Sequence, residues 1–224
     1  EPGCTPCQHC LAVCPRPAVE IFGRDPEESL PGNAVPDPDE ILSLIANRRS
    51  FRSYRHENLD RVTLDKLKDM LRFVPTGVNA HSLHFAFIDE VEVMDSFRNY
   101  VMDRVAGMLA EDPDNPFLSR MERYRRQFIE GRDVIFRGAP HMVLAAAKKN
   151  SPCPAYDPVI ALSYFGLYAQ SLGVGTVWCG LALGTLNSFP ELMARLKLPE
   201  GYKAGYCMLF GPTGLRYPRA TQPD

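Results

Sequence analysis

Four cysteines stand within the first fourteen residues of this 224-residue chain, and their spacing constrains its fold more than any other feature. They are Cys4, Cys7, Cys10 and Cys14, with Pro15 directly after the last. Gaps of two residues let one tight loop offer soft thiolates to several irons of a cubane cluster. A structural zinc site usually joins two distant cysteine pairs instead. The run therefore predicts a 4Fe-4S cluster, and free cysteines in a leading tail are the alternative.

The spacing C-x-x-C-x-x-C-x-x-x-C-P resembles that of bacterial ferredoxins, in which the fourth cysteine ligates a second cluster. Cys4, Cys7 and Cys10 would then need another partner, because the seven cysteines of the chain include one such run. We expect that partner in a second run upstream of this chain, and Cys153, which also precedes a proline, is the alternative. A short apolar stretch at residues 19–22 predicts a strand that closes the segment.

Residues 24–38 are rich in proline and acidic residues, which is typical of a linker. We therefore expect two domains: residues 1–31 as a ferredoxin-like 4Fe-4S segment, incomplete in this chain, and residues 32–224 as the larger unit. The chain is 45% hydrophobic and 23% charged, which is ordinary for a globular protein and argues against disorder. A net charge of −2 argues against a broad nucleic-acid surface. No apolar run reaches the roughly 18 residues of a membrane span, so we expect a cytoplasmic protein.

The larger unit alternates helical and strand patterns, which indicates an α+β fold with three or four strands. Asp37 and Pro38 are typical of the first residues of a helix, and apolar residues at helical spacing follow Thr63. Further helices are predicted at residues 93–110 and 117–137, and an almost wholly apolar one runs from Asp157 to a C-terminal cap at Gly173. Strands are predicted at residues 84–89, 141–147 and 203–210.

Two groups of arginines are candidates for binding an anion. Guanidinium groups beside a hydroxyl suit a phosphate, although a solvated basic face is the common alternative. Two glycine-containing segments, residues 75–81 and 173–180, can present backbone N–H groups to a ligand; the second lacks the strand-then-helix order of a dinucleotide-binding loop. The arginine groups comprise Arg48, Arg49, Ser50 and Arg52 in one stretch and Arg216 and Arg219 near the end.

Five segments in the same order give the chain, from about residue 38 onward, a resemblance to the flavin-dependent nitroreductase family. They are Arg48-Arg49-Ser50-x-Arg52, Pro75-Thr76-Gly77-x-Asn79-Ala80-His81, Gly138-Ala139-Pro140, Leu172 to Gly180, and Leu198 to Tyr202. With the cysteine run in front, the whole chain resembles ferredoxin-fused nitroreductase-like proteins. The resemblance implies a three-layer fold around a mostly antiparallel sheet, and a homodimer with FMN at the interface.

The resemblance also implies roles for individual residues. Arg48, Arg49, Ser50 and Arg52 would hold the flavin phosphate, ribityl chain and ring edge, and Arg216 and Arg219 would complete the phosphate site. Pro75, Thr76, Gly77, Asn79 and His81 would reach the flavin from the partner subunit. Cys179 and Gly180 would lie at the N5 edge of the ring through backbone N–H groups, and Trp178 would pack beside it.

The function expected from these features is an FMN-dependent reduction of electron-poor acceptors such as nitroaromatics or quinones. The donor would be NAD(P)H or a ferredoxin-like protein, and the cluster would feed electrons to the flavin. No side-chain acid is expected to be catalytic, because the cofactor supplies the chemistry. The alternative is a redox-sensing or electron-relay module without a dedicated substrate. We expect His56, His84, His141 and Cys207 to be structural.

Overall fold

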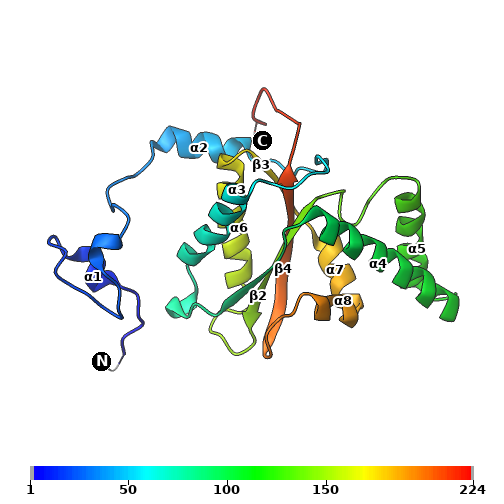
Figure 1. Cartoon of the computed structure of the whole chain (residues 1–224), viewed down its shortest axis with the longest axis horizontal. Helices are drawn as coiled ribbons and strands as arrows, with labels where there is room; N and C mark the ends of the chain where they lie inside the picture. Colours follow the sequence, from blue (N-terminus) through cyan, green and yellow to red (C-terminus); the bar gives the residue numbers. More distant parts are fainter. Residues whose placement is uncertain (1–2, 223–224) are drawn as a thin grey trace.

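The computed structural model describes residues 3–222 and shows a four-stranded sheet covered by helices on both faces (Figure 1). The strands are β1 (Leu83–Ile88), β2 (His141–Lys148), β3 (Val174–Trp178) and β4 (Tyr202–Pro212). The α-helices are α1 (His9–Val13), α2 (Pro38–Asn47), α3 (Arg61–Asp69), α4 (Val91–Glu111), α5 (Pro116–Ile129), α6 (Asp157–Ser171), α7 (Gly180–Ser188) and α8 (Pro190–Arg195). Short 3₁₀ helices are η1 (Pro26–Glu28), η2 (Met70–Phe73) and η3 (Gly77–Asn79).

The sheet has the strand order β1-β2-β4-β3, and every neighbouring pair is antiparallel. Leu144 of β2 stands opposite Ala86 of β1 on one side and Cys207 of β4 on the other. The expected α+β class with an antiparallel sheet is confirmed. β2 and β4 are the two central strands, and β1 and β3 are the edge strands.

Alternation along β2 and β4 divides the core between the two faces of the sheet. Met142 and Leu144 face the layer of α4, α5, α7 and α8, together with Cys207 and Leu209. The intervening side chains, among them Val143, Met208 and Phe210, face α3 and α6. Helix α6 is thus packed against the sheet along its length, as the nearly continuous apolar sequence predicts.

Local sequence signals set most of the helix boundaries. Asp37 caps α2 by accepting the N–H of Asp39 at 2.8 Å, as expected, and Gly173 follows α6 with a φ of 74°. Helix α3 begins earlier than expected, because Asp60 rather than Thr63 is its cap and accepts the N–H of Thr63 at 2.9 Å. The helix predicted over 117–137 ends at Ile129, and a glycine at position 131 takes a φ of 84°.

The segment at residues 173–180 corrects one expectation. Its first half is strand β3 and its last residue begins α7, so the order is strand then helix after all. Gly175 weakens the strand signal in the sequence. In the fold this glycine makes room for another side chain, since a Cβ there would lie 2.9 Å from Cγ of Phe51.

The N-terminal cysteine segment lies to one side of the sheet and its helices (Figure 1). Within residues 3–40, Leu11 is buried and the other residues are exposed or half-buried. The strand expected at residues 19–22 is wrong: a tight turn with a single bridge between Ile21 and Arg24 stands there, and Phe22 has a φ of 54°. Across residues 3–222, the helices are all too short or too polar to span a bilayer.

Candidate functional site

The arginine-rich segment after α2 runs along the edge of the sheet. Arg48 caps the C-terminal end of α2, and Ser50 forms a parallel bridge with Thr176 of β3. The N–H of Phe51 donates to the carbonyl oxygen of Thr176 at 2.9 Å. These backbone contacts hold the segment beside β3, which leads directly to Trp178 and Gly180.

The C-terminal stretch returns to this same segment. The rings of Phe51 and Tyr217 are 5.6 Å apart, and the guanidinium carbon of Arg49 lies 6.0 Å from the centre of the Tyr217 ring. A cavity of about 550 Å³ opens between the two segments, and Arg55 and Arg216 both line it. Its other lining residues are Asn47, Phe51, Gln170, Gly173, Val174, Thr213, Leu215 and Tyr217.

Of the arginines expected to bind an anion, Arg216 lines this cavity, whereas Arg48, Arg49 and Arg52 do not; Arg55, three residues after Arg52, lines it instead. Arg219 is exposed and lies outside the cavity lining. Tyr217, Phe51 and Gln170 also line the cavity and were not among the residues predicted from the sequence. The aromatic residue one position after Arg216 was the available signal for Tyr217.

Arg49, which lies over the Tyr217 ring and outside the cavity lining, has a donor that lacks a partner. Its Nη1 donates to the carbonyl oxygens of Ala46 at 2.8 Å and Arg48 at 2.7 Å. Its Nη2 is buried and finds no acceptor among the described residues. A buried donor without an acceptor is costly, and a phosphate oxygen is a strong acceptor for a guanidinium group. The residues present thus fit a phosphate-bearing ligand.

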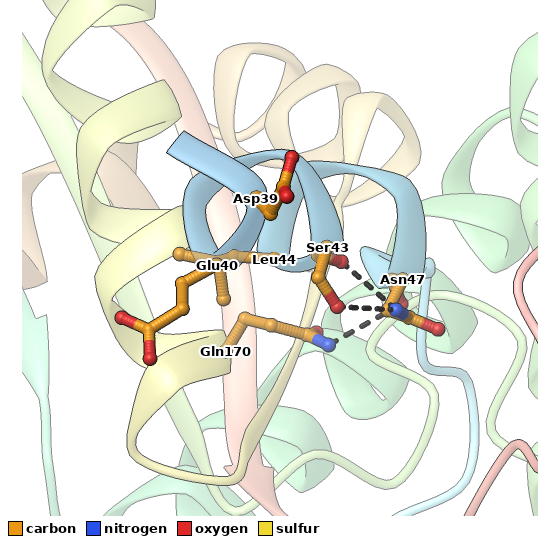
Figure 2. A pocket seen from close by; sticks show the side chains of 6 residues that line it. All are labelled: Asp39, Glu40, Ser43, Leu44, Asn47 and Gln170. Atoms are coloured by element: carbon orange, nitrogen blue, oxygen red, sulfur yellow. Dashed lines mark hydrogen bonds between the residues drawn. The ribbon is translucent and has the colours of Figure 1, made fainter. Parts of the chain in front are cut away.

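Helix α2 is joined to the C-terminal end of α6 beside this cavity. Figure 2 shows the Gln170 amide of α6 pointing toward the last residue of α2, where Nε2 donates to the carbonyl oxygen of Asn47 at 3.2 Å. Asn47 in turn donates from Nδ2 to the carbonyl oxygen of Ser43 at 2.9 Å. The C-terminal end of α6 is consequently the arginine end of the site.

The loop at residues 75–81 lies at the opposite end of α6. The N–H of Gly77 donates to Oδ1 of Asp157, the first residue of α6, at 3.0 Å. The thirteen residue-to-residue steps from Asp157 to Gln170 correspond to roughly 20 Å at about 1.5 Å per step. One chain therefore does not bring Thr76, Asn79 and His81 close to Arg48–Arg52.

Trp178, Cys179 and Gly180 form the junction of β3 and α7. Trp178 packs against Tyr206 with 5.2 Å between ring centres. The N–H of Cys179 donates to the carbonyl oxygen of Cys207 at 3.2 Å, so it is already engaged. Gly180 is the first residue of α7 and has no intrahelical acceptor for its own N–H, which makes it the better donor to a ligand.

Neither buried thiol near this junction is a reactive group. The Cys179 thiol donates to the carbonyl oxygen of Ile135 at 3.2 Å, and the Cys207 thiol donates to the carbonyl oxygen of Cys179 at 3.2 Å. Burial raises the pKa of both thiols, so they stay protonated near neutral pH. Cys207 is fully buried, as expected of a structural residue.

The N-terminal cysteines do not form a metal centre in this structure. Cys4, Cys7 and Cys10 are exposed, and the Cys14 thiol contacts the carbonyl oxygen of Arg16. Within residues 3–222, no three histidine, cysteine or acidic side chains gather closely enough to hold a metal ion. The segment does touch the loop of residues 75–81, because Nδ2 of Asn79 donates to the carbonyl oxygen of Thr5 at 2.8 Å.

Comparison with known proteins assigns the fold to a family. The sequence profile of the nitroreductase family matches residues 45–212. The chain belongs to the nitroreductase family. The match includes both the Arg48–Arg52 stretch and the loop of residues 75–81, and it leaves out the cysteine run and Arg216. Membership in the nitroreductase family supports an oxidoreductase enzyme, as expected.

A curated relative of this nitroreductase-family chain is the FMN reductase (NAD(P)H) of Bacillus subtilis (strain 168). It is 26% identical over 164 residues, which are 72% of this chain and 61% of the relative. The chain thus spans about three fifths of the relative's length.

Solved nitroreductases share the fold. One from Bacteroides fragilis NCTC 9343 with bound FMN has a TM-score of 0.62 at 22% identity, covering 82% of this chain and 95% of that chain. Another from Desulfitobacterium hafniense DCB-2 with bound FMN has a TM-score of 0.62 at 27% identity, covering 83% of this chain and 94% of that chain.

Proposed function

We propose that this chain is an FMN-dependent oxidoreductase that passes electrons from NAD(P)H to electron-poor small molecules such as nitroaromatics or quinones. Two observations carry the proposal: a cavity lined by Arg55 and Arg216, and the Nη2 atom of Arg49, which is buried without an acceptor among the described residues. The guanidinium carbon of Arg49 lies 6.0 Å from the ring centre of Tyr217, which lines the cavity. A flavin phosphate would supply that acceptor. The FMN in the related solved structures and the name of the Bacillus subtilis relative support the choice of flavin.

The flavin would lie along β3, and each residue would contact a different part of it. Arg48, Arg49 and Arg216 would hold the phosphate, while Ser50 and Arg52 would contact the ribityl chain and ring edge. Arg219 is assigned to the phosphate on family resemblance alone. FMN, when bound, supplies the two-electron redox chemistry.

The ring edge would lie where β3 meets α7. The free N–H of Gly180 would donate to the N5 edge of the ring, where negative charge develops on reduction. A Cβ on Gly180 would lie 2.9 Å from the hydroxyl oxygen of Tyr206, so glycine also keeps this approach open. Trp178 would pack beside the ring.

A homodimer would complete the site. One face of α6 is exposed and mostly apolar, and it includes Val159 (39% exposed), Ile160 (38%) and Tyr164 (49%). A stripe of this kind on a helix is normally covered by a partner. If a second copy packs its α6 antiparallel on this stripe, a two-fold axis brings the partner's loop of residues 75–81 toward the arginine end of this chain. Thr76, Asn79 and His81 would then contribute from the partner subunit.

The iron–sulfur cluster remains a hypothesis that rests on the cysteine spacing. Because the described thiols do not gather, no electron-transfer step through a cluster is part of this proposal. Iron and acid-labile sulfide assays on anaerobically purified protein test it. Stoichiometric iron and sulfide would show that the segment refolds around a cluster, whereas their absence would leave the flavin domain acting alone.

The decisive experiment combines flavin binding with turnover. Apoprotein titrated with FMN should quench flavin fluorescence with a stoichiometry of about one per chain, and the loaded protein should oxidise NAD(P)H when a nitroaromatic or quinone is present. Arg49→Met should weaken FMN binding, whereas Arg132→Ala, which removes an exposed arginine far along the chain, should not. FMN binding without turnover on any acceptor would favour the electron-relay function instead.

A further inference from the structure

Asp157 is a buried carboxylate that holds the loop of residues 75–81. It is 2% exposed, and its Oδ1 accepts the N–H of Gly77 at 3.0 Å. Its own N–H donates to the carbonyl oxygen of Cys153 at 3.0 Å, which fixes the carboxylate at the start of α6. The loop is therefore held by the first residue of α6, whose other end lies beside the arginine segment.

The loop needs such an anchor because its backbone is strained. Val78, Asn79 and His81 have φ values of 48°, 57° and 45°, in the left-handed region that side chains with a Cβ seldom adopt. Strain of this kind persists only where surrounding contacts enforce it, and it concentrates at functional sites. Within the loop, the hydroxyl oxygen of Thr76 accepts the N–H of His81 at 2.9 Å, so the anchored and strained parts are continuous.

Close packing holds Gly77 on the side away from Asp157. A Cβ on Gly77 would lie 2.6 Å from Sγ and 2.9 Å from Cβ of Cys153. Gly77 thus sits between the Asp157 carboxylate and the Cys153 side chain. Small displacements of α6 would move Thr76 and Asn79 with it.

The Asp157 carboxylate both favours and disfavours the folded state: an acidic residue in the first turn of α6 suits the helix dipole, but one of its oxygens has no partner. Oδ2 of Asp157 is buried and has no donor among the described residues. A buried polar atom without a partner destabilises the folded state, and an uncharged side chain would avoid that cost. Within residues 3–222, the hydrogen bond that the carboxylate makes goes to the loop.

We propose that Asp157 is a positioning residue for flavin binding: it fixes Gly77, and through it the orientation in which Thr76 and Asn79 are presented to FMN across the dimer interface. The inference deepens the proposed function and rests on it. Asp157 acts through the backbone of the loop and does not itself touch the flavin. Its carboxylate can be tested separately from the flavin, because the hydrogen bond to Gly77 exists within one chain.

The test compares Asp157→Ala with Asp157→Asn in the full chain. Asp157→Ala removes the acceptor, so FMN binding would have to order the loop, and the Kd for FMN should rise at least about tenfold. Asp157→Asn keeps an acceptor oxygen for Gly77 and should stay within about threefold of wild type. Hydrogen exchange of the Gly77 amide in the apoprotein should accelerate in Asp157→Ala and not in Asp157→Asn.

Asp60→Ala is the matched control, because Asp60 likewise accepts one backbone N–H at the start of a helix and lies at α3. It should lower stability without changing the Kd for FMN. An unchanged Kd or an unchanged Gly77 exchange rate in Asp157→Ala would overturn the inference. If wild-type protein fails to bind FMN, the proposed function and the flavin role of Asp157 both fall, while faster Gly77 exchange in Asp157→Ala would still establish the anchor.

Discussion

Phe51 and Tyr217 pack edge to face with their ring centres 5.6 Å apart and their planes at 64°. They lie far apart in the sequence, and Arg49 lies over the Tyr217 ring. This contact draws the C-terminal stretch onto the arginine segment, and both rings line the cavity that we propose holds FMN.

Tyr217→Ala should weaken FMN binding. The change removes an aromatic pair and a cation–π contact that together contribute on the order of 1–2 kcal/mol, so the Kd should rise roughly tenfold. Tyr217→Phe keeps both contacts and should bind as wild type does. Fluorescence titration checks both variants, and equal affinities for Ala and Phe would contradict the role of the ring.

Arg216 and Arg219 should differ in how much they contribute to FMN binding. Arg216 lines the cavity and Arg219 does not, so Arg216→Ala should weaken FMN binding more strongly, by about 1.5–3 kcal/mol if a charge-assisted contact to phosphate is lost. Titration of both variants with FMN and with riboflavin, which lacks the phosphate, gives the measurement. The larger effect should vanish for riboflavin. A stronger loss in Arg219→Ala would show that the C-terminal stretch is arranged differently when FMN is bound.

Ile160→Asp should break the dimer. Burying an unpaired carboxylate on the α6 stripe costs several kcal/mol, so the dimer dissociation constant should rise at least about a hundredfold. Val93→Asp introduces the same charge on an exposed residue of α4 and should leave assembly unchanged. Sedimentation velocity with and without FMN measures this. Stoichiometric FMN on an Ile160→Asp monomer would refute the shared site.

Gly77→Ala should disturb the flavin loop. The new Cβ would collide with Cys153, and relieving that overlap costs on the order of 1–3 kcal/mol. FMN affinity and the denaturation midpoint should both fall. Gly107→Ala, within α4, meets only Nη1 of Arg104 at 3.9 Å and should stabilise the helix by about 0.5–1 kcal/mol. Parallel chemical denaturation of the two variants makes the comparison direct.

His141 should make the free energy of unfolding decrease as the pH falls below about 6.5. It is fully buried, Nε2 accepts the N–H of Leu59 at 3.0 Å, and burial lowers its pKa from 6.5 to about 4. Asp89, which favours the charged form, and Lys68, which opposes it, are the charged groups that face it.

Because the unfolded chain binds a proton that the fold excludes, stability is full above about pH 6.5 and decreases toward pH 4, by up to about 3 kcal/mol. His141→Gln keeps the acceptor for Leu59 and should flatten this dependence in urea titrations. His84→Gln, which changes a partly exposed histidine, should not. An unchanged slope in His141→Gln would assign the acid sensitivity to other groups.

Some features followed from local sequence because local physics decides them. Asp37 and Gly173 bound their helices as predicted, since a side-chain cap and a left-handed glycine depend on neighbouring residues only. The Arg48–Arg52 and 75–81 stretches were also found in the sequence, because their residue types suit phosphate contacts and a polar loop. By contrast, β3 was missed, since its pairing with β4 outweighs the weak strand preference of Gly175.

Side-chain patterning thus predicted helices α2 to α6, three of the four strands and the candidate groups, but not which groups meet. That Tyr217 reaches Phe51, that Asp157 anchors Gly77, and that the loop and the arginines stand at opposite ends of α6 all depend on contacts between residues distant in the chain. Such contacts are set by how α6 packs on the sheet. The cysteine run is the converse case: its spacing suits a cluster, yet the folded chain of residues 3–222 leaves its thiols apart.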